Sequence, residues 1–454
     1  MGIASIEQIE CEPRIYMHLC ASEVSVYPAV ESPQMDARFE CDLRSFVGKY
    51  TAVWLSSAVG TPTSAMTYTA SAQRRNERNT DLLIDSMEKE LRNYPSRPRE
   101  QSGWRERIFV TLRQFGTKSF RFPDSHFDVI FSPDYFAVTR AFARQARAFD
   151  ESIETDALAQ ALRNVWVMNC LQMFLGRRPS LSPSVFAYSM LYPYTDNHLD
   201  QPKLPYETKR MACRRLGLRL SGRNIEPCDA HEAAVFRLVE MIEGEYPRAT
   251  SPEVYSSLLA IHAGQVKSLG QQHTPFAPDE TTLLRISVEK GGSSVLADGW
   301  LVGGEMRRAE ADFFFGFGVM LQLLDDLQDL PDDRNAGHWT LFTRTASAEC
   351  LDRHTSQLWH FVHNVLDSRG CLADSHGLEL RDLIRRNSTI LLLRAMAESA
   401  GYYSADYVHH MERFSPLSFA FLRDRRVAIE KRFARIWPPL ARRRKLRSIF
   451  DLLG

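Results

Sequence analysis

The chain has 454 residues, of which 44% are hydrophobic and 25% charged, as in a globular protein with an apolar core. Its 56 lysines and arginines balance 56 aspartates and glutamates, so the zero net charge gives no support for bulk binding to nucleic acid. The eight cysteines contain no CxxC pair, which fits free thiols in a reducing compartment better than a disulfide framework or a zinc site.

Residues 1–125 show little sustained periodicity. A short β-type run (23–28) and a stretch rich in Thr, Ser and Ala (61–72) precede one predicted helix over 81–94. Residues 95–102 have the composition of a polar linker. We expect this N-terminal region to be partly irregular, and its composition assigns it no role.

From residue 126 to about residue 440 the pattern becomes helical. Ser132 and Pro133 form a good helix start, and apolar residues then recur every three or four positions along 135–149. No convincing strand alternation interrupts this region, so we expect an all-α bundle larger than four helices. Further helices are predicted over 152–176, 183–200, 205–220, 229–244, 252–271, 279–299, 303–330, 346–367, 376–399 and 416–436.

No targeting or membrane-spanning segment is evident in the sequence. The N-terminus lacks a basic start followed by an apolar run, and the longest apolar run (311–324) is interrupted by Asp312 and Gln322. We therefore expect a cytoplasmic protein. The tail (441–454) joins a basic run, 442–445, to several apolar residues, which predicts a solvated tail or, alternatively, peripheral contact with a membrane surface.

Two acidic clusters dominate the chain: Asp196-Asn197-His198-Leu199-Asp200 and Asp325-Asp326-Leu327-Gln328-Asp329. Two carboxylates four positions apart lie on one face of a helix, one turn apart, and their repulsion is unfavourable unless a cation sits between them. Two such clusters, each ending a largely apolar stretch, predict a divalent-metal site between two facing helices. The candidate metal ligands are Asp196, Asp200, Asp325 and Asp329, with Asp326 as a further candidate catalytic carboxylate.

The chemistry that suits this pattern is the ionisation of a diphosphate. Mg²⁺ prefers oxygen ligands and is commonly held by one or two carboxylates together with substrate phosphates. An apolar groove below the acidic helix ends would hold a hydrocarbon chain, exclude water and stabilise a cation against aromatic faces. The candidate cavity residues are Tyr188, Tyr192, Phe314 and Gly318, the last because it removes side-chain bulk.

In these motifs the chain resembles the all-α isoprenoid synthases. The second cluster matches their DDxxD motif, and the first matches the DxxxD motif of the squalene/phytoene synthase branch and of the related bacterial tetraprenyl-curcumene and large-terpene synthases. The clusters begin at positions 196 and 325, a separation of 129 that is typical of the family. Downstream, Asp332-Asp333-Arg334 and His338-Trp339-Thr340 are similar to the Arg and aromatic residues that follow the second motif in squalene synthases.

The resemblance implies an isoprenoid synthase-type bundle around a central apolar cavity. It also implies a cluster of up to three Mg²⁺ ions and a polyprenyl diphosphate as substrate. The chain lacks the NSE-type motif of ordinary terpene cyclases, the adjacent-Asp first motif of chain-elongating prenyltransferases, and a dinucleotide fingerprint. These departures favour ionisation and cyclisation of one substrate over head-to-head coupling of two.

Basic groups are expected to complete a diphosphate site. Lys290 lies in an otherwise apolar helix, where the family often places a Lys or Gln near the metal cluster. Lys267 and Arg334 are further candidates, since Lys supplies a point charge and Arg a bidentate contact to phosphate. A lone basic residue on a helix is nevertheless more often a solvated surface group.

Three classes of function are compatible with these observations. The first is a terpene synthase acting on an allylic polyprenyl diphosphate, and the second is a prenyltransferase that condenses two such substrates. The third is a non-catalytic helical interaction protein whose acidic clusters lie on its surface. An all-α nucleotide pyrophosphatase fits less well, because the two clusters that dominate this chain are built from aspartates, whereas those enzymes favour Glu-rich ExxE motifs.

Overall fold

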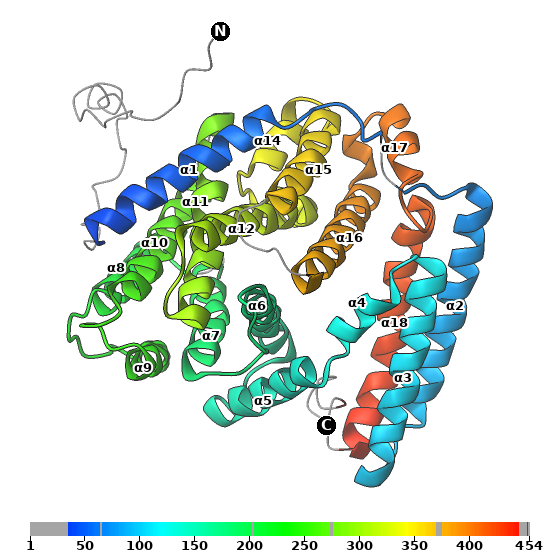
Figure 1. Cartoon of the computed structure of the whole chain (residues 1–454), viewed down its shortest axis with the longest axis horizontal. Coiled ribbons are helices and arrows are strands. Elements are labelled where there is room, and N and C mark those ends of the chain that lie inside the picture. Colours follow the sequence, from blue (N-terminus) through cyan, green and yellow to red (C-terminus); the bar gives the residue numbers. More distant parts are fainter. Residues whose placement is uncertain are drawn as a thin grey trace.

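The computed structural model is all-helical in the part of the chain that it describes, which confirms the predicted all-α class (Figure 1). No strand occurs among the described residues, although one isolated bridge pairs Gln272 with His338. The structure describes residues 35–63, 66–201, 204–272, 276–368, 375–444 and 452.

The helices follow one another through short connections. Their bounds are α1 (Ala37–Ser56), α2 (Ala70–Arg92), α3 (Pro98–Ser119), α4 (Asp124–Ile130), α5 (Pro133–Phe149), α6 (Thr155–Phe174), α7 (Pro183–Leu199), α8 (Tyr206–Leu220), α9 (Ala230–Glu245), α10 (Pro252–Ser268), η2 (Leu269–Gln271), α11 (Glu280–Gly303), α12 (Arg308–Gln328), α13 (Leu330–Ala336), α14 (Leu341–Ala348), α15 (Asp352–Asp367), α16 (Ser375–Glu398), η3 (Ala400–Tyr402), α17 (Ala405–Glu412) and α18 (Phe419–Arg444).

Helix α11 forms the centre of the bundle. It packs against α6, α7, α10 and α12, and every residue from Gly291 to Val302 except Trp300 is buried. A helix that is buried on nearly all sides lacks the polar stripe of a surface helix. This position explains why the sequence of α11 is rich in small and apolar residues.

Helices α11 and α12 approach each other unusually closely at two glycines. A methyl group on Gly318 would overlap the backbone carbonyl oxygen of Gly291, and one on Gly291 would overlap Gln322. Gly316, two positions nearer the start of α12, leaves room for the ring of Tyr50. Gly316 therefore makes room for Tyr50 of α1, and Gly318 makes room for the backbone of α11, which occupies most of the space beside it.

The described part of the N-terminal region is mostly helical, with non-helical segments at 57–63 and 66–69. Helix α1 is built into the bundle: the Tyr50 hydroxyl donates a 2.8 Å hydrogen bond to the Asp312 carbonyl, and the side-chain amide of Gln357 donates one of 2.7 Å to the Trp54 carbonyl. Residues 98–102, predicted to belong to a linker, begin α3, where Pro98 occupies the first turn. The predicted β-type run (23–28) lies outside the described residues.

Helices α2, α3 and α18 pack together at one side of the molecule (Figure 1). Arg425 and Arg432 of α18 pair with Asp81 and Asp85 of α2 at 2.8 and 2.6 Å. A small cluster of buried apolar side chains joins this group, and it includes Leu452 from the C-terminal tail. Leu452 is therefore turned inward, whereas residues 445–451 lie outside the described part. Within that part, the helices include none that is both long and apolar enough to cross a membrane.

Several predicted helix boundaries are confirmed, one predicted helix begins later than expected, and one is divided. Ser132 caps α5 by accepting a hydrogen bond from the Tyr135 amide at 3.3 Å. The helix predicted over 303–330 begins at Arg308, because Gly304 adopts a positive φ of 70° and ends α11. The helix predicted over 346–367 is split into α14 and α15.

The close approach of α11 and α12 predicts that a larger residue at Gly318 destabilises the protein. Gly318→Ala should lower the free energy of unfolding by about 3 kcal/mol, because the added methyl meets a backbone carbonyl that cannot move aside without shifting a whole helix. The matched control is Gly48→Ala in α1, where nothing lies within 4 Å and the alanine should be neutral or stabilising. Urea unfolding measures both, and equal stability of the two variants would contradict this packing.

Candidate active site

The two acidic clusters line one cavity. The first ends α7 and the second ends α12, and their five aspartates share a cavity of about 650 Å³. The same cavity is bordered by Asp333, just after the second cluster, and by Lys290 of α11. The facing arrangement that the sequence predicts for these helix ends is thus present, with all five aspartates on the wall of the same space.

Each cluster occupies the last turn of its helix. The Asp200 amide donates to the Asp196 carbonyl at 2.8 Å, and the Asp329 amide donates to the Asp325 carbonyl at 2.9 Å. The C-terminal end of a helix carries the negative pole of its dipole, so carboxylates there are unfavourable. The placement of these acids therefore works against helix stability and favours a cation as their partner.

Burial and the repulsion of neighbouring carboxylates shift the pKa values of Asp196 and Asp329 upward. Burial raises the pKa of Asp196 to about 6, while Lys290 opposes the shift and Asp200 adds to it. Burial raises the pKa of Asp329 to about 7, and the charges of Asp325 and Asp333 add to that shift. The ionised forms of these groups are thus destabilised in the protein alone, and a cation bound among them would reverse this.

Asp326 is held differently from its neighbours in the second cluster. Its carboxylate accepts hydrogen bonds from the Ser287 hydroxyl and from the side-chain amide of Gln322, both at 2.7 Å. Burial nevertheless raises the pKa of Asp326 to about 7. In the described part of the chain, no side chain donates a hydrogen bond to the carboxylates of Asp325 or Asp329. Asp325 and Asp329 are therefore available as ligands, whereas Asp326 ties α12 to α11.

Lys290 is the basic residue that both clusters share. Burial lowers the pKa of its ammonium group, but four surrounding aspartates raise it, and the net shift is upward. Those aspartates are Asp196, Asp326, Asp200 and Asp325. Lys290 thus lies on α11, between the two acidic helices, and lines the cavity that they share.

The structure adds one basic residue that the sequence reasoning missed. Arg163 of α6 lines the cavity, and its charge opposes the upward pKa shifts of Asp325 and Asp329. Nothing near position 163 signals this role, because Arg163 lies far from both clusters in sequence and only the packing of α6 brings it to the second one.

The two other expected basic groups do not line the cavity. Lys267 forms an ion pair with Glu289, and its side chain is about half exposed. Arg334 is exposed; its guanidinium donates to the Ser347 hydroxyl at 3.1 Å and lies 5.2 Å from the ring centre of Tyr402. The expectation that Lys267 and Arg334 lie in the diphosphate site is therefore corrected. Each lies within a few positions of a cavity residue, but its side chain points away from the cavity on its own helix.

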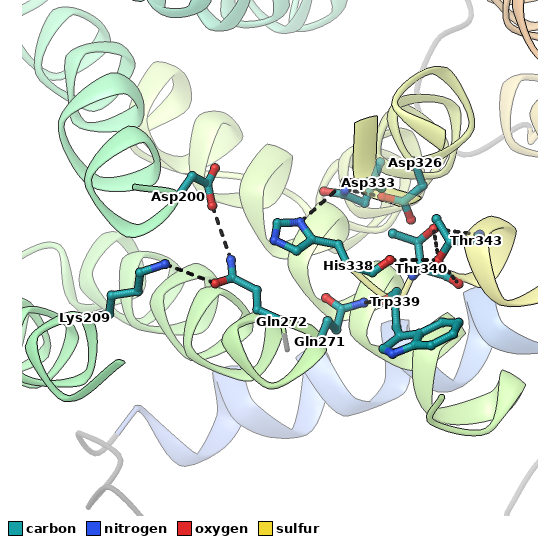
Figure 2. A network of polar contacts seen from close by, with 11 residues as sticks. Asp200, Lys209, Gln271, Gln272, Asp326, Asp333, His338, Trp339, Thr340 and Thr343 are labelled. Carbon is teal, nitrogen blue, oxygen red and sulfur yellow. Dashed lines mark hydrogen bonds and ion pairs between the residues drawn. The ribbon is translucent and has the colours of Figure 1, made fainter. Parts of the chain in front are cut away.

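A network of hydrogen bonds ties the rim of the cavity together (Figure 2). The side chain of Gln272 donates to Asp200 at 3.4 Å through its amide nitrogen and accepts from Lys209 at 3.3 Å through its amide oxygen, and its backbone forms the bridge to His338. Gln271 and Trp339 exchange two hydrogen bonds of 2.8 and 3.1 Å. These contacts hold the segment after the second cluster against the end of α10, next to the first cluster.

An apolar pocket adjoins the acidic cavity. It has a volume of about 350 Å³, lies among α7, α8, α9 and α10, and shares Tyr192, Asp196 and Gln265 with the acidic cavity. Its apolar walls include Leu191, Leu199, Leu204, Met211, Leu216, Leu220, Val235, Phe236, Leu258 and Ile261. An apolar space therefore opens beside one acidic cluster, lateral to α7.

The expected cavity residues divide between these two spaces. Tyr192 borders both, and its hydroxyl lies 2.9 Å from the Ser294 hydroxyl, while Tyr188 borders only the apolar pocket. Gly318 borders the acidic cavity. Phe314 is a correction: it lines neither space, because its ring is fully buried against Phe313 and Gly299 in the core.

No family model, curated protein or solved structure matches this chain.

The aspartates fit Mg²⁺ in one particular way. Among the residues that the structure describes, no three His, Cys, Asp or Glu side chains are grouped closely enough to hold one ion by themselves. Mg²⁺ usually retains several waters and takes one or two carboxylates, with substrate phosphates completing its shell. The two pairs, Asp196 with Asp200 and Asp325 with Asp329, suit that mode of binding.

We predict that Mg²⁺ raises the melting temperature of the protein by several degrees at about pH 8 and has little effect at about pH 5. Asp196 and Asp329, with pKa values of about 6 and about 7, are ionised at the higher pH and protonated at the lower. The stability of the metal-free protein should change with pH in the opposite direction. The raised folded-state pKa values of these aspartates stabilise the protein at low pH, and this stabilisation is lost as pH rises through those pKa values.

Thermal unfolding with and without Mg²⁺ tests this prediction. Asp329→Asn should remove most of the Mg²⁺ effect, whereas Asp332→Asn should retain it, because Asp332 is exposed and does not line the cavity. An Mg²⁺ effect that is equal at both pH values would count against a carboxylate site.

Asp298 is a buried acid that the sequence reasoning missed. It lies on α11 and is fully buried, with one carboxyl oxygen accepting a 3.0 Å hydrogen bond from the side-chain amide of Asn164. Its other oxygen has no hydrogen-bond partner among the described residues. Burial raises the pKa of Asp298 well above its usual range, because the ionised form is disfavoured in the core.

Asp298→Asn should therefore stabilise the protein increasingly as pH rises. Because its folded-state pKa is raised, the Asp298 carboxyl makes its full contribution to the free energy of unfolding of the wild type below about pH 4. Above that pH the contribution falls by ~1.4 kcal/mol per pH unit. The variant keeps the acceptor for Asn164 and lacks this loss. Urea unfolding from about pH 5 to pH 8 measures the difference, with Asp332→Asn as the exposed control; a difference independent of pH would show that Asp298 is ionised.

Proposed function

We propose that this protein is a Mg²⁺-dependent class I terpene synthase. In this proposal it ionises an allylic polyprenyl diphosphate, and the resulting cation cyclises or eliminates to a terpene with release of diphosphate. One observation carries the proposal: an acidic cavity bordered by two helix-end aspartate clusters and Lys290 adjoins an apolar pocket through Tyr192, Asp196 and Gln265.

The acidic cavity has the charge pattern of a diphosphate site. Asp196, Asp200, Asp325 and Asp329 would hold Mg²⁺, which when bound neutralises the charge of the leaving group. Lys290 and Arg163 add positive charge on α11 and α6, between and opposite the aspartates. These two residues would bind diphosphate oxygens and orient the C–O bond that breaks, whose electron pair leaves with the diphosphate.

The apolar pocket suits the hydrocarbon part of the substrate. Its aliphatic and aromatic walls would exclude water, so that the allylic cation reacts with its own double bonds instead of being hydrolysed. Tyr192 stands where the two spaces meet, with its hydroxyl held by Ser294. Its ring is thus positioned to stabilise positive charge that moves from the diphosphate end into the pocket.

Replacement of single motif aspartates tests the proposal. Asp196→Asn and Asp325→Asn should each lower turnover by about 100-fold or more, since each removes a charge that holds metal and costs several kcal/mol of transition-state stabilisation. Asp332→Asn, an exposed change in the same part of the chain, should retain wild-type turnover. Circular dichroism checks that all three variants are folded, and wild-type turnover in either motif variant would contradict the metal assignment.

The products from a panel of allylic polyprenyl diphosphates decide among the classes of function. A hydrocarbon of unchanged carbon number supports the terpene synthase. A product with extended or doubled carbon number supports a condensing prenyltransferase instead. No diphosphate release from any substrate, in the presence of Mg²⁺, supports a non-catalytic helical protein.

A further inference from the structure

Helix α8 separates the apolar pocket from the outside of the molecule. Its residues Met211, Ala212 and Leu216 line the pocket, yet the Met211 side chain is also 53% exposed. Figure 1 shows α8 at the outer edge of the molecule, on the side away from α2, α3 and α18. One thin element therefore lies between the apolar pocket and solvent.

The outward face of α8 is apolar and basic together. Met211 and Leu218, seven positions apart, lie on one side of the helix, and Arg214 lies between them. Leu218 is 37% exposed, and Tyr206 at the start of the helix is 42% exposed. Large apolar side chains at such exposure on one short helix are a marker of an interaction surface.

The charges of α8 identify the kind of partner. The helix carries five basic residues and one acidic residue, Glu207. Arg215 and Arg219 are neutralised by Glu232 and Glu243 of α9, at 2.6 and 2.5 Å. Arg214 is exposed and forms no ion pair within the part of the chain that the structure describes. Arg210 pairs with Glu207 at 2.9 Å and Lys209 is buried, so the positive charge of the outward face is that of Arg214, which lies between Met211 and Leu218.

We propose that this face, formed by Met211, Arg214 and Leu218, docks on an anionic phospholipid surface. A helix with basic and apolar residues on its exposed side lies in the membrane interface, with apolar side chains among the acyl chains and arginines at the phosphates. A protein partner would require a more continuous apolar patch, since the core of a protein interface is depleted in charge. Docking in this orientation turns the Met211 wall of the apolar pocket toward the acyl chains.

The inference does not depend on the proposed enzymatic activity, because binding is measured without substrate. The full chain is sedimented with vesicles of phosphatidylcholine alone or of equal parts phosphatidylcholine and phosphatidylserine. We expect binding to the anionic vesicles that weakens with added salt, and much weaker binding to the neutral ones. A chain that binds vesicles but makes no terpene would retain this inference and reject the proposed function.

Variants that leave the pocket lining unchanged test the assignment to α8. Arg214→Gln should weaken binding about fivefold, as expected for the loss of ~1 kcal/mol per basic residue at an anionic surface, and Leu218→Gln should weaken it further when combined with Arg214→Gln. The matched control combines Leu55→Gln and Leu82→Gln, which remove exposed apolar side chains of α1 and α2. The control should bind as the wild type does, and circular dichroism confirms that each variant is folded.

Three results would overturn the inference. The first is absence of sedimentation with anionic vesicles at low salt. The second is loss of binding on neutralising the basic C-terminal run, with Arg442→Gln and Lys445→Gln, but not on changing α8. The third is a concentration-dependent dimer, seen by analytical ultracentrifugation, that Leu218→Gln abolishes, because the face would then be covered by a second copy of the chain.

Discussion

Repulsion among carboxylates at the ends of two helices is the constraint that the rest of this structure has to accommodate. The aspartates of α7 and α12 meet at one cavity, each on the negative end of its own helix dipole, and burial raises the pKa values of Asp196 and Asp329 further. Lys290 and Arg163 offset only part of this charge. The arrangement is costly for folding alone, which is the physical reason to look for a cation and an anionic ligand in this cavity.

Contacts outside the charged groups determine how the helices that carry the aspartates and Lys290 are placed. Gly291 and Gly318 let α11 and α12 pack closely, which fixes Lys290 relative to the second acidic cluster. The hydrogen bond that Asp326 accepts from Ser287 joins the same two helices nearer the cavity. The network around Gln272 and Trp339 then holds the opposite rim (Figure 2). Close packing and rim hydrogen bonds thus oppose the repulsion that would otherwise separate the two helix ends.

The proposed function and the proposed membrane surface meet at the apolar pocket. The pocket adjoins the acidic cavity on one side, at Tyr192, and reaches the outer face of α8 on the other, at Met211. A hydrocarbon substrate partitions into lipid, so a pocket wall that faces a membrane shortens its path through water. The two proposals are tested separately, yet they describe one route from a lipid surface to the diphosphate site.

The sequence by itself determined the helical class, most helices after residue 130, and the two acidic clusters, because helix caps, apolar periodicity and the i,i+4 spacing of carboxylates are local features. Local signals were weak in residues 37–119, so α1 and α3 were missed. Only the tertiary structure decided which residues share the cavity: it brought in Arg163, turned Lys267 and Arg334 away, and buried Phe314 in the core. It also placed the apolar pocket beside α7 instead of beneath both clusters. These outcomes depend on how helices distant in sequence pack and rotate against one another, which no local pattern encodes.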